Sequence, residues 1–386
     1  MSQFGLSEDQ QDYVDHVREV ARNELAPGAH EAGDDGSGQV NRGLLRALGE
    51  LGLLRDLFGG EPDHAPRDAA AMRLCLLRET LAGVNTEAET ALALQGLGSY
   101  PILQSGNEQT VDRWIPGVVS GEVVAAFALS EPGAGSDAAS LSLRAEPDGD
   151  GWRLSGEKTW ISNAPEADVY TVFARTTPDA RARGVTAFAV AGDAEGLSGE
   201  HIDLLVPHAI GRLVFDGVRV TAHDVLGDVD AGFKVAMRTL DLFRPSVGAF
   251  AVGMAQSALD CAVEWSGTRQ VYGAPLHAQQ SVSHTLAEMA TRVQASRLLV
   301  YAAASAYDEG APAPSVTRAA AMAKLYATES AQYVVDQAVQ IHGARALQRG
   351  HLLEHLYREV RAPRIYEGAS EVQRTIIGRA LTTPAQ

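Results

Sequence analysis

"VVAAFALSEPGAGSDAAS", residues 123–140, marks the change of pattern that decides how this chain folds. Upstream of it, apolar residues recur at the spacing of amphipathic helices, whereas residues 123–130 form a short, β-like apolar run. Helical spacing returns near residue 230 and continues towards the end of the chain. The sequence therefore predicts a helical, a β and a second helical segment, in that order.

The first two segments are expected to form an N-terminal helical domain, residues 1–122, and a β-barrel-like or sandwich domain, residues 123–228. Ser7 has the features of a helix N-cap, and helical runs follow around residues 40–54 and 66–83. "LSLRAEPDGDGWRLSG", residues 141–156, predicts a hairpin that turns at "DGDG". Further short strands are expected at residues 168–175, 184–192 and 213–220.

The last segment, residues 229–386, is expected to form an antiparallel four-helix bundle. Long helical patterns with short connections cover residues 246–268, 276–308 and 315–343, and a last helix begins near residue 370. The predicted fold class is therefore α+β and mostly helical.

Composition narrows the possible partners of this chain of 386 residues. Its formal net charge of −17 repels nucleic acid and anionic membranes, so neither is an expected partner. The sequence predicts neither a transmembrane helix nor a signal peptide. Cys75 and Cys261 lie in apolar helical stretches, which predicts buried thiols in a cytoplasmic protein.

"SEPGAGSDAAS", residues 130–140, is a candidate ligand loop. Gly133 and Gly135 resemble part of a dinucleotide fingerprint, but the third glycine is missing and a strand is expected to follow. One interpretation is a flexible connection between strands. The other is a loop whose Ser130, Ser136 and glycine backbone bind a large planar or phosphorylated ligand.

"GEKTWISNA", residues 156–164, places Trp160 and Ser162 on the same side of a predicted strand. Trp160 either covers the β core or forms a platform for an aromatic ring beside a hydroxyl donor. "HLLEH", residues 351–355, has the spacing of some zinc peptidases, with Glu359 as the near acidic candidate for a third ligand. A solvated helix face that carries His and Glu side chains is the favoured interpretation of this motif, so we expect no metal site.

"RIYEGASEVQR", residues 364–374, holds a carboxylate that local structure does not explain. Ser370 and Gln373 have the spacing of a capping box, and Glu371 places an acid in the first helical turn. Glu367 remains without such a role, and Gly368 lets the adjoining backbone approach a ligand closely.

Together these segments resemble acyl-CoA dehydrogenases over nearly the whole chain. The matching blocks are residues 125–137, 155–164, 269–289, 338–347 and 364–374, in the order found in that family. The resemblance implies FAD-dependent α,β-dehydrogenation of an acyl thioester to the trans-2-enoyl thioester. Glu367 matches the base that takes the pro-R α-proton while hydride passes to flavin N5. The resemblance also implies that the backbone N–H of Glu367, next to Gly368, polarises the thioester carbonyl together with a flavin ribityl hydroxyl.

The resemblance also assigns binding residues and partners. It implies an acyl-CoA or acyl carrier protein thioester, an electron-transfer flavoprotein, and a homodimer or homotetramer whose FAD is contacted across a subunit interface. The flavin-lining group comprises Phe127, Leu129, Ser130, Trp160 and Ser162, with Gly135 and Ser136 near the pyrophosphate and the pantetheine arm. The group from a neighbouring subunit comprises Arg269, Tyr272, Gln280, Gln340 and Gly343. The substrate-side group comprises Ser136, Asp241, Phe243, Arg244 and Tyr366.

Some positions depart from the family pattern. Phe243 stands where some relatives carry their base, which leaves Glu367 as the candidate. Ala369 and Ala344 replace a usual threonine and a common glycine. Residues 204–220 lack the usual basic and serine-bearing pattern, so the choice between CoA and acyl carrier protein stays open, as does the acyl group. Two further hypotheses are a flavin oxidase or monooxygenase on the same fold, and a non-catalytic binding protein.

Overall fold

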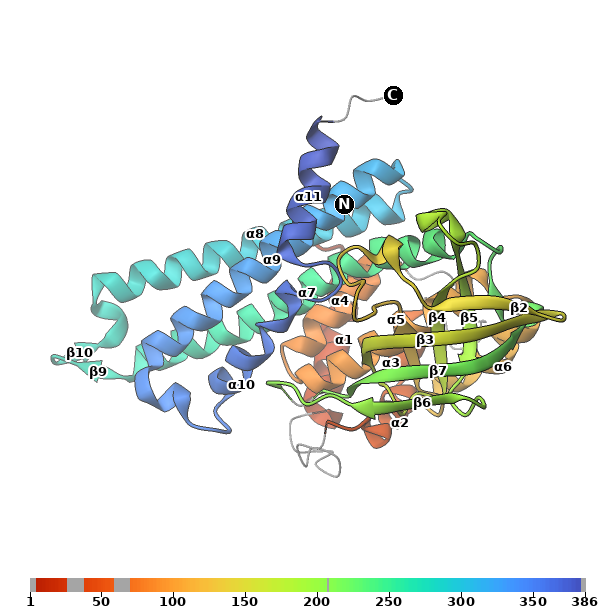
Figure 1. The fold of residues 1–386 in the computed structure, drawn as a ribbon. Coiled ribbons are helices and arrows are strands. Elements are labelled where there is room, and N and C mark those ends of the chain that lie inside the picture. Colours follow the sequence, from red (N-terminus) through yellow and green to blue (C-terminus); the bar gives the residue numbers. More distant parts are fainter. Residues whose placement is uncertain (1–4, 26–37, 59–69, 207, 383–386) are drawn as a thin grey trace. The chain divides into compact units, whose positions relative to one another are not determined.

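The computed structural model describes residues 5–25, 38–58, 70–206 and 208–382 (Figure 1). The chain divides into two units. The helical unit comprises residues 1–26, 70–89 and 241–386, and the mixed unit comprises residues 27–69 and 90–240. The predicted N-terminal domain, residues 1–122, is divided between the two units. The predicted domain boundaries at residues 122 and 228 stay a prediction.

The helical unit is built from α1, α4, most of α7 and the helices that follow it. Its first helix begins as predicted, because Ser7 Oγ accepts from the Gln10 N–H at 3.2 Å while the Gln10 side chain accepts from the Ser7 N–H at 2.9 Å. In Figure 1, α8 and α9 lie alongside each other. The helices are α1 (Glu8–Glu24), α4 (Ala71–Ala82), α7 (Gly232–Thr268), α8 (Gln280–Asp308), α9 (Ala313–His342), α10 (Leu352–Glu359) and α11 (Ser370–Thr382).

Two predicted helix starts are wrong. α7 begins at Gly232 rather than residue 246, and Pro245 lies inside it. Proline usually ends a helix because it lacks an N–H, but the burial of Leu242 and Phe243 just before Pro245 favours helix on both sides of it. α8 begins at Gln280, because residues 276–278 form a separate 3₁₀ turn after the short strands β9 (Gln270–Val271) and β10 (Ala274–Pro275).

Among the described helices, α7 alone is long and apolar enough to cross a membrane, judged by length and composition only. Its most apolar 18-residue stretch is 72% buried within the protein. Such burial is typical of a helix in a protein core.

The mixed unit contains the predicted β segment, several described helices and the first residues of α7. β6, β7, β3, β2, β4, β5 and β8 follow one another in the sheet, and β1 pairs in parallel with β4. The predicted hairpin is confirmed: β2 and β3 are antiparallel from Arg144↔Ser155 to Asp148↔Gly151. The strands are β1 (Ala125–Ala128), β2 (Arg144–Asp148), β3 (Gly151–Ser162), β4 (Val169–Arg175), β5 (Val185–Ala191), β6 (Leu197–His201), β7 (Ile210–Thr221) and β8 (Val225–Leu226). The helices are α2 (Arg42–Glu50), α3 (Leu53–Leu57), α5 (Thr86–Ser105, from residue 90 in this unit) and α6 (Glu108–Ser120).

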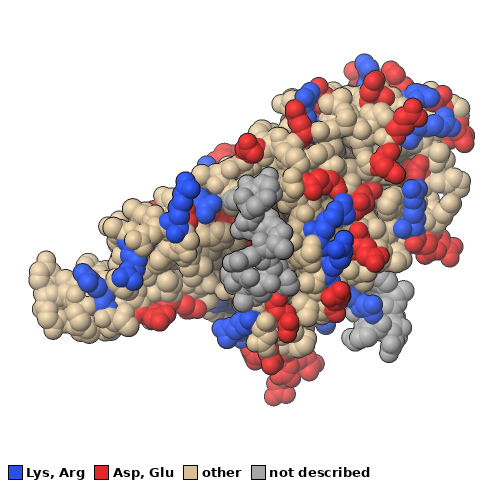
Figure 2. Space-filling model, turned by 90° about the horizontal axis from the view of Figure 1, so that it is seen from below, with Lys and Arg blue, Asp and Glu red and all other residues tan. Residues whose placement is uncertain are grey.

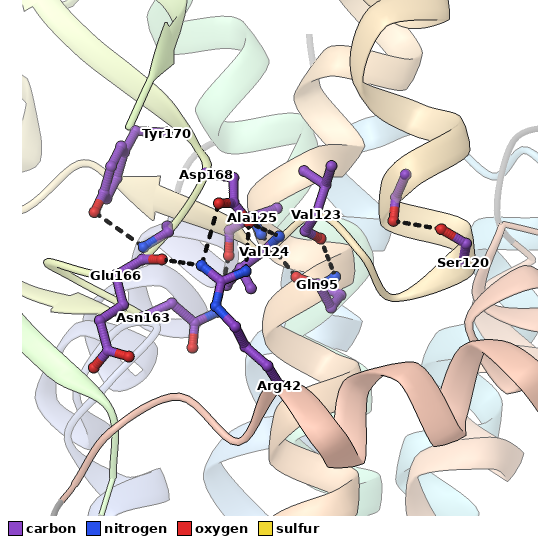
Figure 3. A network of polar contacts seen from close by, with 12 residues as sticks. Arg42, Gln95, Ser120, Val123, Val124, Ala125, Asn163, Glu166, Asp168 and Tyr170 are labelled. Atoms are coloured by element: carbon purple, nitrogen blue, oxygen red, sulfur yellow. Dashed lines mark hydrogen bonds and ion pairs between the residues drawn. The ribbon is translucent and has the colours of Figure 1, made fainter. Parts of the chain in front are cut away.

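A polar network holds β1 and the residues before it in place (Figure 3). The Gln95 side chain donates to the Val123 carbonyl and accepts from the Ala125 N–H, both at 2.7 Å. Asp168 accepts from the Val124 N–H at 2.7 Å and from Arg42 at 2.8 Å. These bonds hold the carbonyl of Val123 and the N–H groups of Val124 and Ala125, where the backbone enters β1. The network therefore positions the strand that carries Phe127.

Close helix packing in the helical unit gives a first stability prediction. A Cβ added at Gly253 on α7 would lie 2.3 Å from the Glu79 carbonyl oxygen on α4, whereas one added at Gly378 on α11 meets no atom of the described residues within 4 Å. We expect Gly253→Ala to lower the free energy of unfolding by about 1–3 kcal/mol, because backbone must move. Gly378→Ala should leave it unchanged or raise it slightly. Urea unfolding of both variants, compared with the unsubstituted protein, checks this.

Candidate active site

The loop between residues 364 and α11 presents Glu367 in an unusual backbone conformation. Glu367 has φ 50° and Gly368 has φ 96°, so two consecutive residues have positive φ. A non-glycine residue in this region costs about 1–3 kcal/mol and persists only where its surroundings hold it. The loop must therefore be held by specific contacts.

Lys324 on α9 provides those contacts, and sequence reasoning missed it. Its ammonium donates to the Tyr366 carbonyl at 2.9 Å and to the Gly368 carbonyl at 2.7 Å, the residues on either side of Glu367. The lysine side chain is fully buried. The available signal was a lone lysine in the apolar stretch "AAAMAKLYA", residues 319–327.

The predicted capping box at α11 is wrong. Ser370 is the first helical residue, and its hydroxyl donates to Glu329 at 2.7 Å. The Gln373 side chain instead donates to the Gly368 carbonyl at 2.8 Å. The spacing identified the helix start, but the Ser370 side chain binds α9 and the Gln373 side chain binds the loop. Glu371 does lie in the first turn, as predicted.

One carboxylate oxygen of Glu367 is buried and has no hydrogen-bond partner among the described residues. Burial raises the pKa of this carboxyl, while the charges of Arg78, Lys324 and Arg244 oppose that rise. The net pKa is raised, which brings the group nearer to the range in which a carboxylate accepts a proton well. The arrangement is therefore that of a buried proton acceptor.

Arg78 on α4 and Glu89 on α5 form a buried ion pair in the same unit, which sequence reasoning also missed. The exposed fractions of the two side chains are 3% and 0%. Arg78 also donates to the Ser246 hydroxyl at 2.7 Å, and Glu89 accepts from its Nε. Neither residue belongs to a recognisable motif, so nothing in the chain predicted that they meet.

The predicted substrate-side residues of this unit take different positions. Arg244 donates to Asp241 at 3.1 Å, and Thr317 also donates to Asp241 at 2.9 Å. Arg244 Nε is buried and lacks a hydrogen-bond partner among the described residues. Phe243 is buried, whereas the Tyr366 side chain is 37% exposed.

The predicted flavin-lining residues belong to the mixed unit. Phe127 lies on β1 with its ring centroid 4.9 Å from that of Phe173, and Leu129 is buried just beyond the strand. Trp160 lies where the register of β3 shifts, has φ 58° and is 57% exposed. In this chain the indole therefore does not cover the β core, and the platform interpretation fits better.

Three polar contacts position the residues near Trp160 and Ser130. Lys158 donates to the Leu129 carbonyl and to Glu131, both at 2.9 Å, in a fully buried pair. The Ser162 hydroxyl lies 3.0 Å from Nε2 of His208, whose pKa burial lowers to about 4. His208 is thus a neutral partner of Ser162 near neutral pH. Sequence reasoning had singled out none of Glu131, Lys158 and His208.

Residues 130–140 form an open loop rather than a dinucleotide-binding turn. A 3₁₀ turn, Ala138–Ser140, and then strand β2 follow the glycines, so no helix N-terminus is available there. A Cβ added at Gly133 or Gly135 would meet no described atom within 4 Å, and Ser136 is exposed. The glycine backbone of this loop is therefore open to a ligand.

The residues assigned to a neighbouring subunit are exposed on the helical unit. Tyr272, between β9 and β10, is 95% exposed, and Arg269 and Gln280 flank the same hairpin. Gln340 and Gly343 lie at the end of α9 and directly after it. Near Gly343, the Trp265 ring stacks on His342 at 5.4 Å and Arg345 lies 4.9 Å from the Trp265 ring centroid.

Cys75 is buried as predicted, but Cys261 is only partly buried. Its Sγ lies 3.4 Å from His342 Nε2 and lines a small pocket with Trp265 and His351. The prediction of a fully buried thiol at residue 261 is wrong, because the helix face carrying it borders this pocket.

The histidines of "HLLEH" have local structural roles. His351 is the N-cap of α10 and accepts from the Leu353 N–H at 3.1 Å. His355 lies 2.7 Å from the Thr86 hydroxyl and 3.8 Å from Glu359. Within the described residues, no group of three or more His, Cys, Asp or Glu side chains is placed to hold a metal ion.

Comparison with known proteins places this geometry in a family. Sequence models of the acyl-CoA dehydrogenase N-terminal, middle and C-terminal domains match residues 7–122, 126–218 and 230–382. Cyclohexane-1-carbonyl-CoA dehydrogenase of Geobacter metallireducens is 34% identical over 385 residues, which are 99% of this chain and 100% of that protein.

Two solved structures agree with the sequence comparison. Butyryl-CoA dehydrogenase from Megasphaera elsdenii matches with a TM-score of 0.90 and 34% identity, covering 99% of this chain and 100% of that one. A structure described as PigA with FAD and proline matches with a TM-score of 0.91 and 26% identity, covering 98% and 99%. The predicted fold class and the FAD cofactor are thereby confirmed. This chain belongs to the acyl-CoA dehydrogenase family and is an FAD-dependent oxidoreductase that acts on acyl-CoA.

Proposed function

We propose that the protein dehydrogenates an acyl thioester to its trans-2-enoyl thioester with Glu367 as the α-proton base. The observation that carries this proposal is the buried, unpartnered carboxylate oxygen of Glu367 on a loop held at positive φ. A group left without a partner in a buried site is available to a substrate. Arg78, Lys324 and Arg244 supply positive charge that opposes the rise in the pKa of this carboxyl caused by burial.

In the proposed mechanism, the chain's own residues bind, orient and deprotonate the thioester. FAD, when bound, supplies the hydride acceptor at N5. Glu367 takes the α-proton, and its backbone N–H polarises the thioester carbonyl, which raises the acidity of that proton. Gly368 has no side chain to obstruct this approach. Asp241, Phe243, Arg244, Tyr366 and Ser136 are proposed to contact the thioester.

The proposed flavin contacts follow from the exposed groups of the mixed unit. Trp160 offers an exposed ring face, and Ser162 offers a hydroxyl next to a neutral His208. Phe127 lies on β1, whose first residues are held by the network of Figure 3, and Leu129 and Ser130 follow the end of that strand. Gly135 and Ser136 provide open backbone for the pyrophosphate region.

Trp160→Ala tests the flavin contacts. Because the indole is 57% exposed, we expect the melting temperature of FAD-free protein to change little, while FAD affinity falls about tenfold or more. Trp160→Phe should restore most of the affinity. Trp152, whose ring packs 5.6 Å from Phe188, is the matched control: Trp152→Ala should lower stability without lowering FAD affinity of the folded protein. FAD titration and thermal unfolding separate these results.

We also propose a homo-oligomer in which one protomer contributes Arg269, Tyr272, Gln280, Gln340 and Gly343 to its neighbour's FAD. Residues 270–280 contain no charged Asp, Glu, Lys or Arg, and Figure 2 shows an uncharged tip at the β9–β10 end of the face it presents. A tyrosine 95% exposed in an uncharged segment fits an interface better than open water. Analytical ultracentrifugation of the unsubstituted protein and Tyr272→Asp tests this.

The substrate panel tests the reaction itself. Under anaerobic conditions, acyl-CoA thioesters of different length and the same acyl groups on acyl carrier protein are mixed with the holoenzyme. Loss of the oxidised flavin absorbance with at least one thioester supports the proposal and names its carrier. Flavin that no thioester bleaches contradicts the proposal. An electron-transfer flavoprotein as acceptor, and a cytoplasmic location, are part of the proposal; fast reoxidation of the flavin by O₂ would favour an oxidase instead.

A further inference from the structure

A buried ammonium on α9 holds both sides of the loop that carries Glu367. Lys324 Nζ donates to the carbonyls of Tyr366 and Gly368, at 2.9 and 2.7 Å, so Glu367 lies between two anchored peptide groups. The lysine side chain is 0% exposed. Removing an ammonium from water is costly unless it is paired and hydrogen-bonded, so a lysine at this position needs a compensating function.

The anchored peptides are those with strained backbone. Glu367 and Gly368 have φ 50° and 96°, and Gln373 donates to the same Gly368 carbonyl at 2.8 Å. Ser370 and Arg364 bind Glu329 at 2.7 and 2.8 Å, which fixes the two ends of the loop to α9. Lys324 and Gln373 therefore both act at the centre of the loop, and Lys324 binds carbonyls on both sides of Glu367.

Lys324 also acts on the Glu367 side chain through charge. The titratable and charged groups that face the pair from the packed elements are Arg78, Arg244, Glu329, Tyr366 and Glu371. Arg244 is offset by Asp241, and Arg78 by Glu89. Among the described residues, Lys324 donates to two carbonyls rather than to a carboxylate. Its charge is thus the least neutralised of the three cations near Glu367.

We propose that Lys324 is a positioning residue for the base: it fixes the backbone on both sides of Glu367 and keeps that carboxylate ionised. This inference rests on the proposed function for the role of Glu367, but the backbone half of it does not need the reaction. Catalysis by a positioned base is sensitive to displacements of about 1 Å, which are worth about 10²-fold in rate.

Three variants separate positioning from electrostatics. Lys324→Met removes the charge and both donors, Lys324→Gln removes the charge and keeps an N–H donor, and Lys324→Arg keeps both. Lys234→Met is the matched control, since Lys234 is an exposed lysine on α7. All are studied as FAD-loaded holoenzyme, and melting temperature with FAD content identifies any variant that fails to fold.

Hydrogen exchange of the peptide spanning residues 364–370 tests the backbone half without substrate. We expect at least tenfold faster exchange in Lys324→Met, an intermediate rate in Lys324→Gln, and unsubstituted rates in Lys324→Arg and Lys234→Met. Unsubstituted exchange in Lys324→Met would overturn the positioning role. Because no thioester is present, this result does not depend on the proposed reaction.

The pH dependence of anaerobic flavin reduction tests the electrostatic half. Glu367 must be ionised, so the rate falls as pH drops through its pKa, and a nearby cation lowers that pKa. In the pH–rate profile, we expect the acidic limb to lie about one pH unit higher in Lys324→Met and Lys324→Gln than in the unsubstituted protein. In Lys324→Arg this limb should lie at the same pH as in the unsubstituted protein. Burial lowers the pKa of Lys324 to about 8, so a basic limb near that pH should disappear in Lys324→Arg. A uniform loss of rate with unmoved limbs would overturn this half.

The substrate panel and the Lys324 variants distinguish failure of the proposed function from failure of the inference about Lys324. If no thioester bleaches the unsubstituted holoenzyme, the proposed function is wrong, and the hydrogen-exchange comparison still decides whether Lys324 holds the loop. If the unsubstituted enzyme is active and Lys324→Met retains its rate, pH profile and exchange, the inference about Lys324 is wrong.

Discussion

Glu367→Gln is expected to retain FAD and to lose about 10²–10⁴-fold in the rate of anaerobic flavin reduction by its thioester. Glutamine keeps the size and the backbone of the loop but cannot accept the α-proton. The unpartnered carboxylate oxygen becomes a neutral amide group, which leaves Arg78, Arg244 and Lys324 less balanced. The thermal stability should therefore change modestly, and the chemical step should change greatly.

Stopped-flow absorbance with the thioester identified by the panel measures the effect, and FAD content is recorded for each preparation. Glu371→Gln is the matched control: it lies four residues away and its side chain is 81% exposed. This control should reduce its flavin at the unsubstituted rate. If Glu367→Gln reduces its flavin as fast as the control, another group is the base. Phe243, at the alternative position, cannot serve.

The order of elements was readable from the sequence because it depends on local periodicity. The Ser7 N-cap and the turn of the hairpin at residues 148–151 are local features, and both predictions are confirmed. α7 was predicted too short because Pro245 ends most helices, and only tertiary burial reveals that it does not end this one. Local rules thus predicted the elements better than their bounds.

The residues of the candidate site likewise fall into those that local sequence patterns predicted and those that only the fold reveals. Glu367 was identified because helix-start chemistry accounted for the neighbouring residues but gave no role to this carboxylate. Lys324, Arg78 and Glu89 were missed because their meaning lies in contacts between segments far apart in the chain. The exposure of Trp160 likewise required the register shift in β3, which alternation alone does not reveal. A sequence shows which residues are available for chemistry, whereas the charges that tune them are set by the fold.

Glu89→Leu is expected to have the largest effect on stability. The change leaves Arg78 charged and buried without its carboxylate, and removal of one partner of a buried pair costs about 3–5 kcal/mol. Arg78→Met should cost a similar amount, because Glu89 then loses its cation. The double variant Arg78→Met/Glu89→Leu should recover most of the loss, since apolar residues of similar volume often replace a buried pair at little cost. Urea unfolding of the four proteins gives the coupling free energy, and losses that simply add would contradict a direct buried pair.

The same cycle has a second readout at Glu367, because Arg78 is the cation with the largest influence on that carboxyl. In Glu89→Leu, the positive charge of Arg78 is no longer offset, so the pKa of Glu367 should fall and the acidic limb of flavin reduction should move to lower pH. In Arg78→Met and in the double variant, one cation is missing, and the limb should move to higher pH. If the pair only stabilises the fold, the variants should differ in their free energy of unfolding. The acidic limb of the pH–rate profile of flavin reduction should then lie at the same pH in all four proteins. Opposite movements in Glu89→Leu and Arg78→Met would show that this buried pair sets the ionisation of the base as well as the stability of the fold.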